Sequence, residues 1–225
     1  MTKNKSINFI IRGILILGLV LPSLSHAQNS SLGNWLIYIG NKKLNKKWNL
    51  HHEIQYRNYD AIEDLEQLLL RTGLGYTFKE NKRNILLGYG YISSENYMGN
   101  TTDKNTVNEH RIFQQFSSEQ TLGKLKLSHR YRYEQRFIES DFKMRLRYFL
   151  GLKVPLKIKE KNNYYFSLYN EIFINTKSSL YDRNRLYGGI GYKFSQGLRF
   201  ETGYMNQFFK NGSRDQVNLF CFYSF

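Results

Sequence analysis

The sequence predicts an all-β fold: an antiparallel, transmembrane, up-and-down β-barrel of about 10–12 strands. Polar and apolar residues alternate with period two along almost the whole chain beyond residue 27. Most alternating segments cover eleven to fifteen residues, whereas strands of soluble sheets have roughly five to six and a tilted membrane-spanning strand needs about 9 to 11. The last strand also carries an apolar face that ends in Phe225, a pattern associated with bacterial outer-membrane barrels.

The amino end reads as a secretory signal peptide. Basic residues precede an apolar run over 13–21, and the small residues Ser25 and Ala27 stand three and one positions before the expected cleavage site. An uncleaved anchor is the alternative, but nine apolar residues are too few to span about 30 Å of hydrocarbon. We therefore expect a signal peptide over 1–27 and a barrel domain over 28–225.

Composition fits one folded domain in that second segment. The chain of 225 residues has 33 Lys and Arg against 18 Asp and Glu, and 16% of its residues are aromatic. That aromatic content excludes a disordered basic tail. The single cysteine excludes an internal disulfide and a cysteine-based metal cluster.

Eleven strands are expected in the barrel domain. In chain order they cover residues 33–40, 48–59, 66–78, 84–94, 107–121, 124–138, 142–155, 163–175, 183–194, 198–209 and 214–225. An even number is usual for bacterial single-chain barrels, so eleven is a difficulty. Either the first segment is a short accessory or lumen-threading strand on a ten-strand barrel, or one long segment hides two strands and the barrel has twelve.

Each strand is expected to have one polar and one apolar face. In the sixth strand Arg130 and Arg132 fall on one face, and Tyr131 and Tyr133 fall on the other. Alternation alone does not distinguish a membrane barrel from a soluble sandwich or a lipocalin-like barrel, which buries its apolar face. Tyrosines and phenylalanines near the strand ends favour the membrane barrel, because aromatic girdles lie at membrane interfaces.

Charged residues on the polar faces must then point into the lumen. An arginine that faces lipid at the middle of the bilayer costs roughly 2–4 kcal/mol, so eleven of them would exceed the stability of an ordinary domain. Five glutamates share these faces, which leaves a lumen excess of +6. The expected lumen charge network is Glu53, Arg57, Arg71, Glu109, Arg111, Arg130, Arg132, Glu134, Arg136, Arg145, Arg147, Glu171, Arg183, Arg185, Arg199 and Glu201.

Loop composition supplies an orientation once the carboxyl end is placed in the periplasm. The connections near 79–83, 122–124, 156–162 and 194–197 are then periplasmic, and several are rich in lysine, which suits anionic head groups. The first outer loop, near 60–66, is acidic. Solvation alone would also explain these charges.

Small residues and histidines give only weak functional signals. Gly73, Gly75, Gly88, Gly90, Gly189 and Gly191 are expected to leave room for arginine side chains on the lumen face. Two-residue periodicity puts His51 and His52 on opposite faces, which disfavours a metal site there. Cys221 is expected to face lipid. We expect no metal and no cofactor.

A resemblance covers essentially the whole barrel domain. It rests on Trp35, the Glu53 to Arg57 strand, Asn108-Glu109-His110-Arg111, the segment His129-Arg130-Tyr131-Arg132-Tyr133-Glu134-Gln135-Arg136, Arg145-Leu146-Arg147, Asn170-Glu171, Asn184-Arg185 and Phe225. In these residues the chain is similar to the family known as domain of unknown function 2490. The resemblance implies an outer-membrane barrel of a Gram-negative bacterium and brings no established activity or catalytic residues.

The favoured functional interpretation is a closed structural barrel with a lumen rich in Arg and Glu, located in the bacterial outer membrane. A narrow anion-selective channel, or a barrel that binds a small anion, is the first alternative. The second is a hydrolase acting on lipid or lipopolysaccharide, for which His110 and His129 are candidate bases near Ser117, Ser118 and Ser128. We do not expect an enzyme.

Expected partners are outer-membrane lipids and the barrel-assembly machinery, for which Phe225 and Tyr223 would form the assembly signal. Nucleic acid is excluded, because the arginines are interleaved on strand faces behind a signal peptide. The sequence leaves the oligomeric state and the identity of a ligand open.

Overall fold

Period-two alternation is realised as eleven long strands in a computed structural model, which describes residues 32–60, 63–78, 82–99, 101–158, 161–177 and 179–225. The expected signal peptide lies outside the described residues. The strands are β1 (Gly33–Lys43), β2 (Trp48–Asn58), β3 (Leu65–Phe78), β4 (Arg83–Tyr97), β5 (Lys104–Leu122), β6 (Leu125–Ile138), β7 (Asp141–Ile158), β8 (Lys161–Asn175), β9 (Tyr181–Lys193), β10 (Leu198–Phe209) and β11 (Gly212–Ser224). All eleven expected strands are confirmed, with bounds that differ by three residues or fewer.

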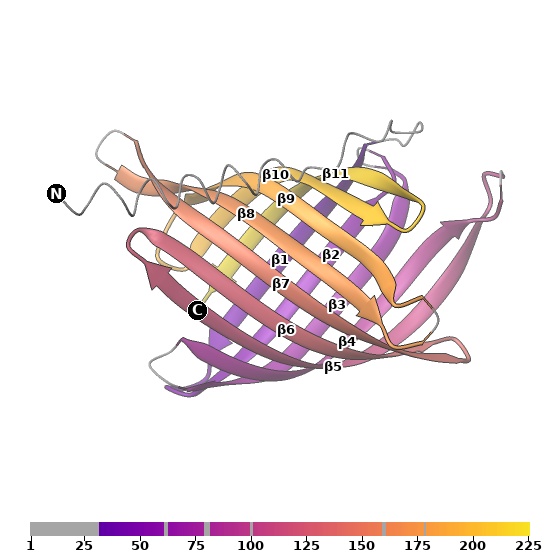
Figure 1. Cartoon of the computed structure of the whole chain (residues 1–225), viewed down its shortest axis with the longest axis horizontal. Coiled ribbons are helices and arrows are strands. Elements are labelled where there is room, and N and C mark those ends of the chain that lie inside the picture. Colours follow the sequence, from indigo (N-terminus) through magenta and orange to yellow (C-terminus); the bar gives the residue numbers. More distant parts are fainter. Residues whose placement is uncertain (1–31, 61–62, 79–81, 100, 159–160, 178) are drawn as a thin grey trace.

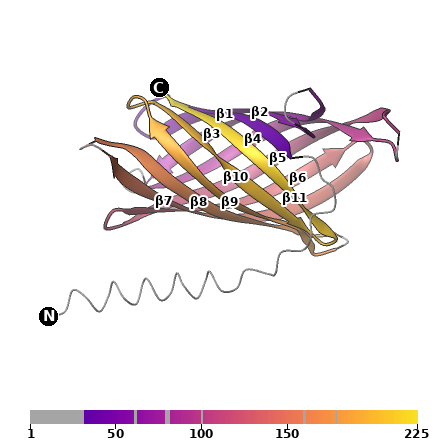
Figure 2. The same cartoon turned by 90° about the horizontal axis from the view of Figure 1, so that it is seen from above.

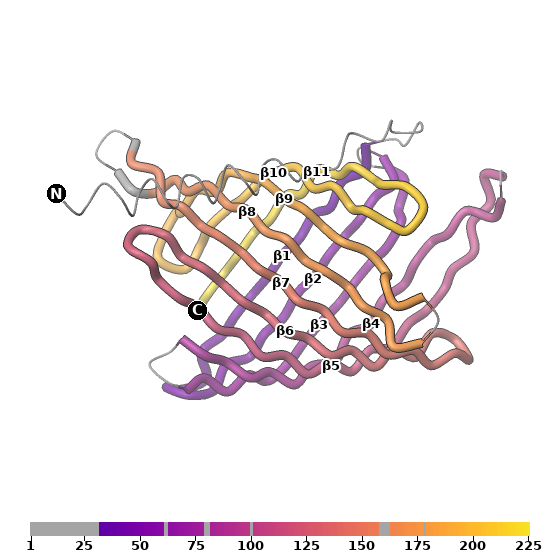
Figure 3. Tube along the Cα trace, viewed as in Figure 1, coloured from indigo at the N-terminus to yellow at the C-terminus, as the bar shows by residue number. Residues whose placement is uncertain are grey.

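The strands form one closed barrel in sequence order, with β1 paired to β11. Figures 1 and 2 show tilted strands that wrap around one lumen, and Figure 3 shows the β4–β5 hairpin reaching beyond its neighbours. Among the described residues, the structure has no helix long and apolar enough to cross a membrane. The all-β closed barrel predicted from the sequence is therefore confirmed.

The closing pair corrects both expectations about the odd strand. Ten neighbouring pairs are antiparallel, whereas β1 and β11 are parallel, from Gly33 beside Gln216 to Asn41 beside Ser224. Strand direction alternates along an up-and-down chain, so the first and last of eleven strands run the same way and can only pair in parallel. β1 is a full barrel strand, and neither the ten-strand nor the twelve-strand interpretation is correct.

We call this β1–β11 pair the seam. Beyond β11, the Phe225 amide donates a hydrogen bond to the Asn41 carbonyl at 3.1 Å, and its own carbonyl accepts one from the Lys43 amide at 2.8 Å. The Phe225 ring lies against Tyr223 and His52, with centroids 4.8 and 5.8 Å away. Residues at the carboxyl end thus extend the pairing that closes the barrel.

Apolar side chains cover the outer face of the barrel. On β6, Tyr131 is 51% exposed, whereas its neighbour Arg132 is 3% exposed because it points inward. The same alternation holds on β11, where Asn218 is buried inside the barrel and Leu219 is exposed outside. The exposed apolar residues include Leu36, Ile54, Leu70, Leu74, Ile85, Leu87, Ile112, Leu146, Leu150, Leu168, Leu186, Ile190, Phe200, Tyr204 and Leu219.

The inward face of β1 is apolar from Trp35 to Ile39, which contradicts the expectation of a polar face along every strand. Trp35 and Ile37 point into the lumen and form a buried cluster with Tyr187 and Met205. Ile39, Tyr169 and Phe220 pack against this cluster. Because both faces of β1 are apolar, alternation could not identify its inner side. The cluster backs the seam from within the barrel.

Aromatic rings also occupy much of the space beside the lumen glycines. A side chain at Gly90 would lie 3.1 Å from Arg71, as expected for a glycine that makes room for arginine. At three other positions the obstacle is a ring: Phe113 beside Gly88, Tyr187 beside Gly189, and Tyr165 beside Gly191. The expectation that these glycines serve arginine is therefore correct only in part.

Acidic residues at the β2–β3 connection, the loop expected to face outward, are paired as well as solvated. Lys104 forms an ion pair with Asp64, and the Tyr97 hydroxyl donates a hydrogen bond to the same carboxylate. Desolvation would raise the pKa of Asp64, but the hydrogen bonds from Lys104 and Tyr97 outweigh it and lower that pKa below its ordinary value. Glu66, expected in this loop, lies in β3 and pairs with Arg214 at 2.8 Å. These contacts link the β2–β3, β4–β5 and β10–β11 connections.

The cluster behind the seam gives a first prediction. Trp35→Ala should lower the free energy of unfolding by about 3–5 kcal/mol, because Trp35 is 3% exposed and its removal leaves a cavity. Leu36→Ala is the control, since Leu36 is the next residue and is 45% exposed on the outer face. Urea unfolding of both variants in the same lipid measures the difference. An equal loss of stability would contradict a role for Trp35 in holding the seam.

Candidate functional site

The candidate site is the lumen, to which eight strands contribute the predicted charged residues. All sixteen residues of the expected network belong to β2, β3 and β5 to β10. Each either points into the barrel or contacts a residue that points into it. Twelve are buried, and Arg130, Arg136, Arg183 and Arg199 are partly buried. Period-two geometry explains this, because each strand presents every second residue to the lumen.

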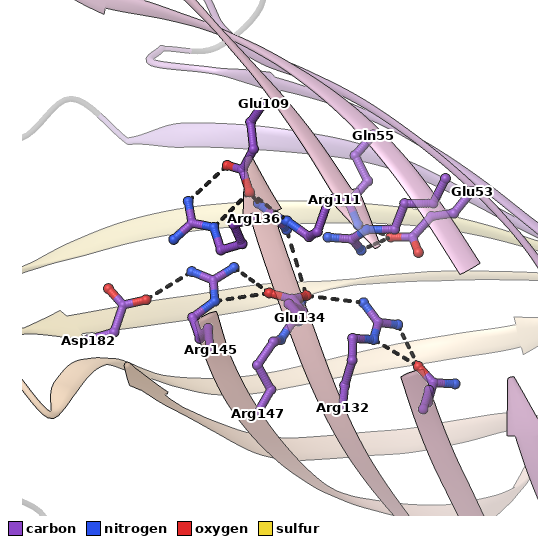
Figure 4. A network of polar contacts seen from close by, with 12 residues as sticks. Glu53, Gln55, Glu109, Arg111, Arg132, Glu134, Arg136, Arg145, Arg147 and Asp182 are labelled. Carbon is purple, nitrogen blue, oxygen red and sulfur yellow. Dashed lines mark hydrogen bonds and ion pairs between the residues drawn. The ribbon is translucent and has the colours of Figure 1, made fainter. Parts of the chain in front are cut away.

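Glu134 of β6 is the centre of the network and is 0% exposed. The Arg145 guanidinium donates two hydrogen bonds to its Oε2, at 3.0 and 2.7 Å, and Arg147 donates one to Oε1 at 2.7 Å. Arg111 and Arg132 lie 3.7 and 3.8 Å from Oε1. One carboxylate thus faces four guanidiniums from three strands, as Figure 4 shows.

Two further carboxylates extend the network along the lumen. Glu109 accepts a bidentate pair of hydrogen bonds from Arg136, at 2.7 and 2.8 Å, and another from Arg111 at 2.8 Å. On the other side of Glu134, Glu171 accepts hydrogen bonds from Arg130 at 2.8 Å and from Arg147 at 2.7 Å. Arg147 therefore bridges Glu134 and Glu171.

Glu53 and Glu201 form ion pairs of their own, separate from those of Glu109, Glu134 and Glu171. Glu53 pairs with Arg71 at 3.0 Å and lies 3.5 Å from His51. Glu201 lies 3.5 Å from Lys153, a cation that the sequence did not single out. Each of the five glutamates thus has at least one cationic neighbour.

Asp182 is a network residue that the sequence reasoning missed. Its carboxylate accepts a hydrogen bond from Arg145 at 2.9 Å and lies 3.3 Å from Arg183. Register shifts beside it, since Phe173 pairs with Arg183 whereas Ile174 pairs with Tyr181, and Asp182 is the extra residue of a β-bulge. Strict alternation assigns Asp182 and Arg183 to opposite faces of the strand. Only the bulge brings Asp182 to the network, and a bulge could not be predicted from this sequence.

Aromatic rings hold the guanidiniums from their flat sides. Arg145, Arg147 and Arg185 lie 5.1, 4.4 and 4.6 Å from the centroid of the Phe173 ring. Trp35 lies against one further arginine, Arg57, at 3.7 Å from its ring, and also against Arg185 at 4.8 Å. Such cation–π contacts are stronger where water is excluded. They therefore stabilise the excess positive charge in addition to the carboxylates.

Buried side chains from every strand pack inside the barrel. Each strand supplies at least one inward side chain that is 5% exposed or less; in order from β1 to β11 these include Ile37, Glu53, Leu69, Ile92, Phe113, Glu134, Arg145, Glu171, Tyr187, Met205 and Gln216. We call the ion-paired part of this interior the plug, which consists of Glu109, Arg111, Arg132, Glu134, Arg136, Arg145, Arg147, Glu171 and Asp182.

A cavity of about 1170 Å³ lies between the plug and the end of the barrel that carries Phe225. We call it the cup. Its described lining includes fifteen lysines and arginines but four glutamates. The mouth of the cup is formed where β2 and β4 begin and by the turns before them, and it carries Lys46, Lys47, Lys82 and Arg83. Arg132 and Arg147 lie at the floor of the cup. The cup is therefore a strongly basic chamber.

Several polar atoms around the cup are buried without a hydrogen bond. They include Nε of Arg71, Arg130 and Arg199 and Nη1 of Arg132. A buried donor without an acceptor is costly, and a guanidinium can accept no hydrogen bond in return. These groups could be satisfied by water or by an anion.

Histidines outside the lumen are bonded to tyrosines. Nδ1 of His110 lies 2.6 Å from the Tyr89 hydroxyl, and Nδ1 of His129 lies 3.0 Å from that of Tyr148. Ser118 is the cross-strand neighbour of His129, but the ring bonds the tyrosine instead. A hydroxyl is therefore within reach of each candidate base, and in both cases it is a phenol.

His51 and His52 point to opposite sides of the sheet. His51 lies beside Glu53 in the lumen, whereas His52 bonds Tyr38 on the outside. Within the described part of the chain, no group of three or more His, Cys, Asp or Glu side chains could hold a metal ion.

Comparisons with known proteins gave one match. A family model described as "Protein of unknown function (DUF2490)" matches residues 32–218. No curated protein and no solved structure matches the chain.

The centre of the plug gives a second prediction. Glu134→Ala should lower the free energy of unfolding by about 3–5 kcal/mol, because it leaves buried guanidiniums without their shared carboxylate. Asp103→Ala, in an exposed connection, should change it by about 0.5 kcal/mol or less. Denaturant unfolding in lipid measures both. If the two variants were equally stable, Glu134 would not be the centre that holds the lumen together.

Proposed function

Because the chain belongs to the DUF2490 family, whose function is unknown, we propose its function from the lumen itself. The protein acts as an outer-membrane β-barrel of a Gram-negative bacterium, closed by its plug and open to one side as a basic cup. The observation that carries this proposal is the buried network of ion pairs around Glu134, together with the buried inward side chains that every strand contributes.

The exposed apolar face supports a membrane location. Soluble monomers rarely expose contiguous apolar patches larger than a few hundred Å². Here exposed leucines, isoleucines and aromatic residues are spread over all the strands, while arginines point inward. This is the arrangement that lipid favours, since an outward arginine at the middle of the bilayer costs roughly 2–4 kcal/mol.

The plug supports a barrel that does not conduct. Glu134 and Glu171 each join guanidiniums from different strands, so a path through the middle would require several ion pairs to separate together. Separating a buried ion pair leaves charges uncompensated at a cost of several kcal/mol. A structural role, or a role at the face of the barrel, fits this lumen better than transport.

Anion binding in the cup is the second candidate function. Fifteen cationic side chains and four glutamates line the cup. A chamber of one sign with low-dielectric walls concentrates ions of the opposite sign. Guanidiniums also bind phosphate and carboxylate groups through paired N–H donors.

We propose no enzymatic activity and no cofactor. The histidines considered as bases bond tyrosine hydroxyls. A lipid hydrolase would instead use a serine or similar nucleophile activated by its base.

Conductance tests the plug. In a planar bilayer the purified protein should show either no conductance or a small one that favours chloride, because any passage runs between guanidiniums. If a small conductance exists, Arg130→Glu with Arg132→Glu should shift its selectivity toward cations. A large cation-selective conductance of the native protein would exclude both the plug and the anion-binding interpretation.

Membrane fractionation tests the location and the role of the carboxyl end. The protein should be recovered in the outer membrane and should migrate differently on a gel before and after heating. Phe225→Ala should lower this yield, because the Phe225 ring packs against Tyr223 and His52 at the seam. Cys221→Ser, on the same outward face, should lower it less. Recovery as a soluble periplasmic monomer would refute the location.

A further inference from the structure

The cup has two chemically different walls, and from this we propose that it binds an amphiphilic anion, a single flexible apolar chain that carries a phosphate or carboxylate group. The inference rests on the proposed anion-binding cup and names the class of its ligand.

One wall, along the seam, is rich in apolar side chains, although Arg57 and Arg185 lie over the Trp35 ring and Arg199 lies over the Phe222 ring. Trp35, Ile37 and Ile39 of β1 line the cup beside Phe220 and Phe222 of β11. Ile39 and Phe220 are only partly buried, so part of this wall still faces the chamber. In a cup that bound only small hydrated anions, such a wall would gain nothing from its apolar character.

The other wall is basic and centres on β6, with a contribution from β3. Arg130 and Arg132 of β6 and Arg71 of β3 line the cup, and each has a buried guanidinium nitrogen without a hydrogen bond. Arg130 is the most accessible of the three, with 29% of its side chain exposed, and it already bonds Glu171. The wall therefore has donors in excess of its acceptors.

Strand order places the β6 arginines across the lumen from the seam, whereas Arg71 of β3 lies two strands from β1. In the closed ring β6 is five strands from β11 in one direction, and β1 follows β11, so β6 faces the seam. A ligand with both an anionic group and an apolar chain can contact the two walls at once. An inorganic anion would leave the seam wall in water, and a neutral amphiphile would leave the guanidiniums unpaired.

Tryptophans give the cup its own reporter. Trp35 lies in the seam wall and Trp48 at the mouth, and they are the two tryptophans of the chain. In the variant Trp48→Phe the fluorescence comes from Trp35 alone. The protein is held in nanodiscs of zwitterionic lipid, and empty nanodiscs correct for partitioning of the probe.

Decyl phosphate is the probe, compared with hexyl phosphate, inorganic phosphate and neutral decyl maltoside. We expect a saturable change of Trp35 fluorescence with decyl phosphate, and affinity that rises roughly three- to fourfold for each methylene between hexyl and decyl. Inorganic phosphate should bind at least tenfold more weakly than decyl phosphate. Decyl maltoside should give no saturable change.

Arg130→Gln and Arg136→Gln form a matched pair, because both arginines lie on the inner face of β6 and bond a glutamate. Arg130 lines the cup and Arg136 belongs to the plug on its far side. Arg130→Gln should weaken decyl phosphate at least tenfold, and Arg136→Gln should leave it unchanged. Ile39→Gln should weaken decyl phosphate but not inorganic phosphate. Heat-modifiable mobility checks that each variant is folded.

Each contrary outcome identifies what fails. Equal affinities for inorganic and decyl phosphate would overturn the amphiphile and leave a plain anion site in the cup. Equal binding of decyl maltoside, or no effect of Arg130→Gln, would overturn the assignment of the anionic group to β6. Absence of binding by either phosphate would overturn both ligand proposals, while the conductance measurement would still decide the plug separately.

Discussion

A guanidinium group is costly to place against lipid and costly to bury without a partner, and this constraint determines where the arginines of the barrel lie. The apolar outer face leaves the lumen as the only place for the arginines, and the width of eleven strands forces them together. Four of them meet at one fully buried carboxylate, Glu134, and Arg147 passes the contact on to Glu171. Aromatic rings such as Phe173 supply the remaining neighbours, so charge balance here depends on π faces as well as on carboxylates.

Sequence alone predicted most of the fold because the two-residue period is strong and the strands are long. The strand bounds and the inward face of β6 follow directly from that period. It fails where a strand has no polar face, as in β1, and where one residue is inserted, as at Asp182. The direction of the closing pair depends on the parity of the whole set of strands, which no local pattern contains. Pairings such as Arg145 with Asp182 join residues far apart in the chain, so their partners emerge only with the registers.

The seam and the lumen chemistry depend on each other. Parallel pairing is slightly less stable per residue than antiparallel pairing, and this barrel has its one parallel pair where it closes. Behind that pair lie Trp35, Ile37 and Phe220, the residues that make one side of the lumen apolar. The centre of the charge network lies on β5 to β8, while Arg57 and Arg185 stack on the Trp35 ring at the seam. The packing at the closure thus gives the seam side of the interior more apolar surface than the side around Glu134.

The odd number of strands also limits circular permutation of the chain. In a barrel with an even number of strands both ends of the sheet emerge on the same side, and a short linker could join them into a circular permutant. Here Gly33 and Ser224 lie at opposite ends of their parallel strands. A linker between them would have to cross the apolar outer face or pass through the filled interior. The order of strands in this barrel consequently cannot be cyclically shifted by a short loop, and its first and last strands are fixed by geometry.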